Sequence, residues 1–405
     1  MSALFPFRAL RPVPSVAPRV ASVPYDVVDA SEARDLAAGN PLSFLRVTRS
    51  EIDLPADVGP YDDVVYARAV ENLATLRREA PLVVDDAPSL YLYRLRMGAH
   101  EQVGLAGCFS VDEYDRGLVK KHEKTRRDKE DDRTRHIIEL RAQTGLVFLT
   151  YKASETVDAI VSRLSRGTPA CDFTAPDGVA HTLWRVTGAD CDALVAAFGD
   201  LEALYIADGH HRAASASRAH RALVDAGAAN EQSGRFVAVA FPDVQMQILP
   251  YNRIVRDLAG HSADSLVEAM RAIAPVAPGG PTPGRAGLVS MFVDGRWYTI
   301  ELPQPDPGAS RADSLDVDVL QRRILEPVLR VGDPRTDKRI DFVGGIRGTG
   351  ELEQLVSSGR AAVAFSLHPV GIADLMAIAD AGGIMPPKST WFEPKLRDGL
   401  LVHLI

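Results

Sequence analysis

Five chemically versatile residues follow one another near the middle of this 405-residue chain: Asp208, Gly209, His210, His211 and Arg212. The apolar residues 204–207 directly before them predict a short buried strand. The alanine-rich segment 210–226 predicts a helix, because alanine has the highest helix propensity. The five residues are therefore expected on a turn that leads from a strand into the N-terminus of a helix.

Such a turn favours the binding of an anion. The first backbone N–H groups of a helix have no intrahelical partner, and the helix dipole favours negative charge there. Gly209 lets an oxygen-rich ligand approach the backbone, and His210 and His211 add donors. Arg212 can hold a phosphate through two parallel hydrogen bonds. Asp208 would repel a phosphate, which indicates a divalent cation or a proton acceptor; the alternative is a plain helix cap with histidines that face solvent.

Five stretches spread along the chain resemble the domain-of-unknown-function family 1015: Pro6–Pro12, Pro24–Val28, His122–Thr125, Ala207–Ala214 and Pro386–Leu396. That family is related to ParB/sulfiredoxin-like proteins and includes free-serine kinases that use pyrophosphate as phosphoryl donor. The resemblance implies an α+β fold, with a ParB/sulfiredoxin-like core and N- and C-terminal α/β elaborations.

The segment 120–136 contains no apolar residue. A helix without an apolar stripe is held by charge pairs or by a ligand, and polyanion binding is one explanation for so many donors. The alternatives are a solvent-exposed helix with i,i+4 ion pairs or a mobile loop. His122 and Glu123 match the family signature. We predict Glu123 as general base, and His122, Lys124 and Arg127 as phosphate-binding or charge-balancing groups.

Two residues of the N-terminal region are further candidates. Asp26 follows Pro24 at a conformationally restricted turn, where it is either catalytic or a turn-forming aspartate. Arg46 lies between apolar neighbours in segment 43–48, which we predict to be a strand. A buried arginine needs an anionic partner, which is either a structural carboxylate or the substrate.

The C-terminal third offers two more sets of polar groups. Asn252 and Arg253 directly follow a predicted strand, a position where sheet proteins commonly place site residues. Segment 385–396 holds three prolines and four phosphate-compatible residues: Lys388, Ser389, Thr390 and Lys395. We expect this tail to return to the site, with Lys388 on phosphate and Ser389 and Thr390 on the substrate; the alternative is a tail that only caps the core.

Composition narrows the function classes. The formal net charge of −8 disfavours a nucleic-acid binder, which usually needs a basic face. The three cysteines form no CxxC motif, and no signal peptide or membrane-length apolar run is visible, so we expect a cytoplasmic protein without membrane partners. The sequence has no Walker phosphate loop, protein-kinase signature or dinucleotide fingerprint. A nucleotide enzyme would thus need an unusual site, whereas a pyrophosphate enzyme would not.

These observations predict three regions: residues 1–100 contribute to the site, 101–258 form the ParB-like catalytic core, and 259–405 end in the returning tail. The predicted activity is a phosphotransferase with an alcohol acceptor, which converts free L-serine to O-phosphoserine with pyrophosphate or, less favoured, a nucleotide. Asp208 would bind Mg²⁺, Asp26 or Glu123 would take the hydroxyl proton, and His210 would assist at the donor. A phosphohydrolase at the same turn and a ParB-like nucleotide- or DNA-binding regulator stay open, as does a monomeric or homodimeric state.

Overall fold

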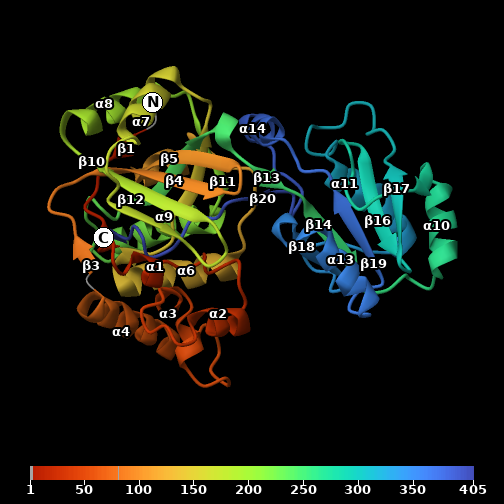
Figure 1. The fold of residues 1–405 in the computed structure, drawn as a ribbon, viewed down its shortest axis with the longest axis horizontal. Helices are drawn as coiled ribbons and strands as arrows, with labels where there is room; N and C mark the ends of the chain where they lie inside the picture. The colour runs from red at the N-terminus through yellow and green to blue at the C-terminus, as the bar shows by residue number, and fades with distance from the viewer. Residues whose placement is uncertain (1–2, 81) are drawn as a thin grey trace. The chain divides into compact units, whose positions relative to one another are not determined.

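The computed structural model describes residues 3–80 and 82–405. It divides into two compact units, the first formed by residues 1–246 with 394–405 and the second by residues 247–393. Both units combine helices with β-sheets (Figure 1), which confirms the predicted α+β class. Among the described residues, no helix has the length and apolar character needed to span a bilayer.

The first unit is built on a mixed nine-stranded sheet with the order β6-β11-β8-β12-β5-β4-β10-β9, and β1 pairs with β5. In chain order its strands are β1 (Leu4–Phe5), β4 (Leu90–Met97), β5 (His100–Ser110), β6 (Val119–Lys120), β8 (Val147–Tyr151), β9 (Cys171–Thr174), β10 (Ala180–Val186), β11 (Leu204–Asp208) and β12 (Arg235–Pro242). The strand β8 runs parallel to β12 and antiparallel to β11. The central strands are almost wholly buried because helices and tail cover the sheet.

One continuous apolar core joins these strands to the helices around them, with Leu149 and Ile206 among its strand residues. The helices that contribute to it are α5 (Val111–Asp115), α6 (Arg127–Leu140), α7 (Glu155–Leu164), α8 (Gly188–Gly199) and α9 (His210–Asp225). The buried face of α9 consists largely of alanine and serine, and α9 packs against α6. Small side chains on this face allow the two helices to approach closely.

The N-terminal region of this unit contains short helices, namely α1 (Ala17–Val20), α2 (Ala30–Ala37), α3 (Leu45–Thr48), the 3₁₀ turn η1 (Ser50–Asp53) and α4 (Asp63–Glu79). The predicted strand at residues 43–48 was wrong, because this segment forms α3. Phe44 and Val47 pack into one apolar cluster and Leu45 into another. Spacing by three residues on one face requires a helical turn, and this tertiary packing outweighs the local preference for a strand.

The C-terminal tail, residues 394–405, is tied to the first unit by backbone hydrogen bonds. The strand β21 (His403–Leu404) pairs with β7 (Ala142–Gln143). Ser22 and Asp398 exchange two backbone N–H···O bonds, of 3.1 and 3.0 Å, and Leu10 and Val402 do the same at 2.9 and 3.0 Å. The last twelve residues are therefore held between segments from the beginning and the middle of the chain.

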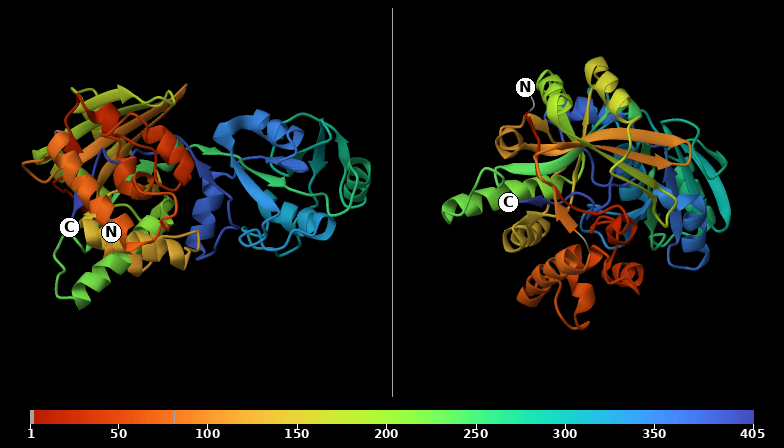
Figure 2. Two further views of the ribbon diagram at one scale, coloured as in Figure 1. Left: turned by 90° about the horizontal axis from the view of Figure 1, so that it is seen from below. Right: turned by 60° about the vertical axis from the view of Figure 1, so that its left-hand side comes forward.

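The second unit has a six-stranded sheet, β15-β17-β16-β19-β14-β18, and a separate pair of strands, β13 and β20. Asp294 and Gly295 both have positive φ and connect β16 to β17, which confirms the hairpin expected from an Asp-Gly pair. The helices of this unit flank its sheet (Figure 2). Its elements are β13 (Ile248–Leu249), β14 (Tyr251–Val255), α10 (Ala263–Arg271), β15 (Val276–Pro278), β16 (Leu288–Val293), β17 (Arg296–Glu301), α11 (Asp316–Leu320), the π-helical turn η3 (Gln321–Leu325), α12 (Glu326–Leu329), β18 (Ile340–Gly344), α13 (Gly348–Ser357), β19 (Val363–Leu367), α14 (Ile372–Asp380) and β20 (Trp391–Phe392).

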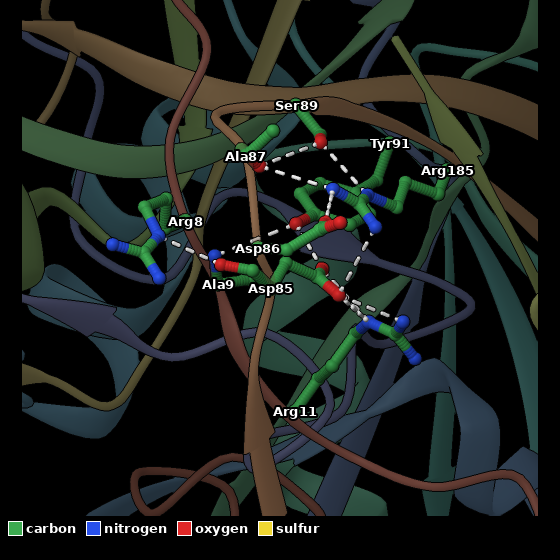
Figure 3. Close-up of polar contacts among 9 residues, drawn as sticks. All are labelled: Arg8, Ala9, Arg11, Asp85, Asp86, Ala87, Ser89, Tyr91 and Arg185. Atoms are coloured by element: carbon green, nitrogen blue, oxygen red, sulfur yellow. Dashed lines mark hydrogen bonds and ion pairs between the residues drawn. The ribbon is translucent and has the colours of Figure 1, made fainter.

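A buried charge network links the short antiparallel pair β2 (Leu10–Pro12) and β3 (Leu82–Val84) to the main sheet (Figure 3). Arg11 donates to both carboxylate oxygens of Asp85, at 2.9 and 2.8 Å, and the Tyr91 hydroxyl donates to Asp85 at 2.6 Å. Arg185 Nη1 lies 3.6 Å from the same carboxylate. Burial by itself raises the pKa of Asp85, but Arg11 and Tyr91 outweigh it and lower the pKa. Asp85 is therefore ionised, and its oxygens have protein partners.

We expect Asp85→Asn to destabilise the protein by about 3 kcal/mol, because it leaves Arg11 without its buried anionic partner. Urea unfolding of the variant and the wild type measures this loss. The matched control is Asp86→Asn, since Asp86 also pairs with Arg185 but its side chain is 86% exposed. An Asp85→Asn midpoint equal to that of the control would show that this network does not stabilise the fold.

Candidate functional site

The predicted strand–turn–helix around Asp208 is confirmed. β11 ends at Asp208, Gly209 adopts the left-handed conformation with φ 91°, and α9 begins at His210. Within the described structure the helix has no side-chain cap; instead the Gly209 N–H donates to Asp208 Oδ1 at 2.9 Å. Asp208 is thus not the plain helix cap that the sequence left open as an alternative.

Arg212 is buried and holds the turn to distant parts of the chain. Its Nη2 donates to both oxygens of Asp26 at 2.8 Å, and its Nη1 donates to the Leu146 carbonyl at 2.7 Å. Burial lowers the pKa of Arg212, but the carboxylates around it outweigh burial and raise the pKa. The guanidinium fork predicted for a phosphate is directed at a carboxylate in this structure, so Arg212 and Asp26 form a fixed pair.

Asp208 is paired with the C-terminal tail. Lys395 Nζ lies 3.0 Å from Asp208 Oδ2, and Asp208 is only 29% exposed. Burial by itself raises the pKa of Asp208, but Lys395 and Arg212 lower it far below the usual value of an aspartate. A carboxylate that is held ionised so strongly is a poor proton acceptor, and it acts here as a fixed negative charge.

The contacts of Asp208 also determine whether it can bind the Mg²⁺ predicted from the sequence. One carboxylate oxygen accepts the Gly209 N–H and the other faces Lys395. Across residues 3–80 and 82–405, no group of three or more His, Cys, Asp or Glu side chains is arranged to hold a metal ion. The residues present therefore do not fit a resident metal ion that is bound by the protein alone.

Two buried histidines and Glu123 form a second group at this turn. The backbone N–H of His122 donates to His210 Nε2 at 3.4 Å, which places the His210 proton on Nδ1. That Nδ1 lies 3.8 Å from Glu123 Oε2, and the two imidazole rings meet edge to face at 4.4 Å. Burial lowers the pKa of His210 well below its ordinary value and that of His122 to about 4. Both rings are therefore neutral near pH 7, beside a glutamate that is 49% exposed.

The remaining candidates of the polar segment lie along the loop that precedes α6. His211 Nε2 accepts the backbone N–H of Arg126 at 2.9 Å, which fixes the end of this loop to α9. Burial lowers the pKa of His211, so it accepts this bond as a neutral ring. Lys124 is exposed on the loop, and Arg127 is the first residue of α6.

Three buried side-chain atoms near the turn have no hydrogen-bond partner among the described residues: His122 Nδ1, Arg212 Nε and Asp398 Oδ2. Buried polar atoms are nearly always paired, and those that are not call for a specific explanation. All three belong to residues that interact electrostatically with this turn. A polar ligand bound at the turn could complete the hydrogen bonds of these three atoms.

Asp398 is the site residue that the sequence reasoning missed. It is 2% exposed, accepts a backbone hydrogen bond from Tyr25 and interacts with Arg212. A signal was present, because Lys395, Arg397 and Asp398 are charged within a C-terminus that is otherwise largely apolar. Lys395, noted among the phosphate-compatible residues, joins Asp208 at the turn.

For Arg46 the sequence left two anionic partners open, a structural carboxylate or the substrate, and in the structure its partner is a structural carboxylate. Its side chain forms an ion pair with Asp53 and donates to the carbonyls of Asn40 and Ala37, at 3.2 and 3.0 Å. These partners lie in the N-terminal helices, so the arginine ties α2 to η1. Its anionic partner is a protein carboxylate.

Five further candidates belong to the second unit and are described within it: Asn252, Arg253, Lys388, Ser389 and Thr390. Arg253 donates to the carbonyls of Tyr251 and Lys388, the latter at 2.9 Å. Asn252 Oδ1 accepts the Leu367 N–H at 3.1 Å, and Ser389 Oγ donates to the Pro386 carbonyl at 2.5 Å. Arg253 thus joins strand β14 to the segment around Lys388, whereas Asn252 joins β14 to β19.

The sequence model of the family described as "Protein of unknown function (DUF1015)" matches residues 4–320. No curated protein matches the chain. A conserved hypothetical protein from Pyrococcus furiosus is similar in structure at 16% identity, with 74% of this chain and 95% of that chain covered and a TM-score of 0.36. A free serine kinase in complex with AMP is similar at 12% identity, 71% and 86% coverage and a TM-score of 0.36. SbnI with a C-terminal truncation, from Staphylococcus aureus, is similar at 13% identity, 74% and 87% coverage and a TM-score of 0.39.

Gly209→Ala should destabilise the protein by about 1–2 kcal/mol, because an alanine at φ 91° is strained. The added methyl group would also meet Arg212 Nη1 at 3.1 Å and press on the hydrogen bond from this nitrogen to the Leu146 carbonyl. Thermal or urea unfolding measures the loss. Gly199→Ala is the control, since Gly199 lies in helix α8 with open space around its Cβ, and alanine there should be neutral or stabilising. Equal effects at the two glycines would contradict the role of the left-handed turn.

Asp398 should make stability depend on pH. Burial raises the pKa of Asp398 to about 7, so the folded protein keeps this proton at pH values where the unfolded chain releases it. The free energy of unfolding should therefore fall as pH rises from about 5 to 7. Urea unfolding across this range should show a flatter profile for Asp398→Asn, whereas Asp225→Asn, at an exposed position, should keep the wild-type slope. A wild-type slope in Asp398→Asn would contradict the assignment.

Proposed function

Because the chain belongs to the DUF1015 family, we propose that it is a small-molecule kinase that phosphorylates the hydroxyl group of free L-serine, with pyrophosphate as donor. The observation that carries the proposal is the uncapped N-terminus of α9 beside a neutral histidine pair and an exposed glutamate. Phosphoryl transfer depends mainly on positioning and charge neutralisation; the histidines and the glutamate can position the reactants, and the positive end of the helix dipole favours the phosphate charge. The resemblance of the sequence to free-serine kinases of this family supports the choice of acceptor and donor.

In this proposal the donor binds at the start of α9. The first N–H groups of the helix point at the phosphate, as helix N-termini do in other phosphate sites. Lys395 and Lys124 add positive charge, and His122 and His211 donate or accept hydrogen bonds as neutral rings. Arg212 contributes the electric field of its positive charge, and its hydrogen bonds keep the turn in place. Mg²⁺ would enter the site bound to pyrophosphate as its counter-ion, because Mg²⁺ commonly binds substrate phosphates and few protein groups.

Glu123 is the proposed general base. It is half exposed, so a small acceptor can reach it, and His210 Nδ1–H lies 3.8 Å away and faces its carboxylate. The serine oxygen attacks one phosphorus atom of pyrophosphate, the bond to the bridging oxygen breaks, and phosphate leaves. The hydroxyl proton passes to Glu123. Asp26 is the weaker candidate for this role, since Arg212 binds both of its oxygens.

A phosphohydrolase is the second candidate, and the exposure of Glu123 favours it. Water reaches a carboxylate that is 49% exposed as readily as a serine hydroxyl does. The same base and the same donor site would then release two phosphates from pyrophosphate. The two activities differ in one observable, the dependence on an amino acid.

We expect phosphorus NMR of the protein with Mg²⁺, pyrophosphate and L-serine to show an O-phosphoserine resonance that is absent without serine. ATP and ADP serve as parallel donors, since a structurally similar free serine kinase was solved with AMP or ADP. Glu123→Gln should lower turnover about 10²–10⁴-fold, the usual contribution of a general base. Glu139→Gln is the matched control, with a side chain that is 46% exposed on α6.

Three outcomes decide between the candidates. Phosphate without phosphoserine identifies the hydrolase, and no product from any donor rejects both activities. Full activity in Glu123→Gln would reject Glu123 as the base while leaving the activity itself in place.

A further inference from the structure

A cavity of about 400 Å³ lies in the first unit, and none of residues 208–212 lines it. Residues of α2, η1, α6 and the segment 55–61 line it, and Tyr25 contributes the wall nearest to Asp26. Its apolar surface comes from alanine, valine and proline side chains together with Tyr61. The walls are thus suited to an organic molecule with an apolar part.

Four cationic side chains line this cavity: Arg34, Arg49, Lys129 and Arg133. Two of them are neutralised by acidic neighbours that also line it. Arg49 Nε lies 3.0 Å from Glu51, and Arg133 Nε lies 2.8 Å from Asp132 and Arg133 also donates to the Thr48 carbonyl. These pairs build the wall and leave no net charge of their own.

Within residues 3–80 and 82–405, neither Arg34 nor Lys129 forms an ion pair with a carboxylate closer than 4 Å, and Lys129 interacts only at longer range with its sequence neighbour Asp128. Arg34 donates one hydrogen bond, from Nε to the Ile52 carbonyl at 3.4 Å, and Lys129 donates to the Tyr61 hydroxyl at 3.2 Å. Each keeps further N–H groups beyond these neutral acceptors, since a guanidinium has five and an ammonium three. The cavity therefore carries an excess of positive charge at these two side chains.

The size of the cavity excludes a close fit to the proposed reactants. A volume of 400 Å³ holds roughly a dozen water-sized groups, more than the heavy atoms of serine or of pyrophosphate. Pockets of this volume typically bind metabolites that bury most of their surface against apolar walls and a few polar groups. An anionic group alone would leave the tyrosine and proline walls in contact with water.

We propose that this cavity binds an organic anion, a phosphate or carboxylate group on an apolar or aromatic body. Arg34 and Lys129 bind the anionic group, and Tyr25 and Tyr61 contact the body. The ligand would lie one residue from Asp26, whose carboxylate holds Arg212. The site does not depend on the proposed kinase activity, because none of the groups assigned to the chemistry lines it.

Isothermal titration calorimetry of the full chain tests this proposal with three probes: phenyl phosphate, phenylacetate and inorganic phosphate. We expect phenyl phosphate, phenylacetate or both to bind. The probe that binds shows whether the site recognises a phosphate or a carboxylate group. Inorganic phosphate should bind at least tenfold more weakly than the aromatic probe, because it makes no contact with the apolar walls. Equal binding of inorganic phosphate, or no binding of either aromatic probe, would overturn the proposal.

Arg34→Gln and Lys129→Gln should each weaken the binding of the aromatic probe about tenfold or more. Arg166→Gln and Lys152→Gln are the matched controls, since both residues are exposed in the same unit outside the cavity. In the part of the chain that the structure describes, neither Arg34 nor Lys129 forms an ion pair, so each substitution should leave the midpoint of unfolding unchanged. An unchanged midpoint would show that the variants are folded. Wild-type binding in both cavity variants would overturn the assignment. Glu123→Gln should bind the probe normally, so failure of the kinase proposal and failure of this one are distinguishable.

Discussion

The buried guanidinium of Arg212 is the constraint on which the first unit depends. A charge removed from water is tolerated only when opposite charge and hydrogen bonds surround it. Asp26 supplies a bidentate partner from the N-terminal region, and the Leu146 carbonyl supplies another acceptor before β8. Asp398, from the C-terminal tail, also interacts electrostatically with Arg212. Because one side chain must satisfy all of these groups, three distant parts of the chain converge on a single turn.

This convergence divides the site into two kinds of charged groups. Arg212 is bound to Asp26 and Asp208 to Lys395, and these two ion pairs define the geometry of the turn and the electric field around it. His210 is kept neutral by burial beside the exposed Glu123. The proposed base, Glu123, is outside these two ion pairs and is half exposed, so a ligand can reach it. The ion pairs thus hold the turn in place beside the residue that would take the proton.

Local structure at the site could be predicted from the sequence, but the pairing could not. The apolar run before Asp208, the glycine and the alanine-rich segment each act within a few residues, and strand, turn and helix follow from them. The ion pair of Arg212 with Asp26 joins residues 186 positions apart, and that of Lys395 with Asp208 spans 187. No spacing rule reaches that far. Segment 43–48 shows the converse, because packing against two apolar clusters converts a stretch with strand-forming residues into a helix.

The pairing of charges also separates structural from ligand-binding clusters in this fold. Around Asp85, two arginines and a tyrosine converge on one carboxylate and leave it no capacity for a ligand (Figure 3). In the 400 Å³ cavity, acidic partners account for Arg49 and Arg133 but not for Arg34 or Lys129. Composition alone cannot distinguish these places, since both are rich in arginine. The distinction depends on whether each cation meets a carboxylate in space, and Arg34 and Lys129, which form no such ion pair among the described residues, are the residues that we propose to bind an organic anion.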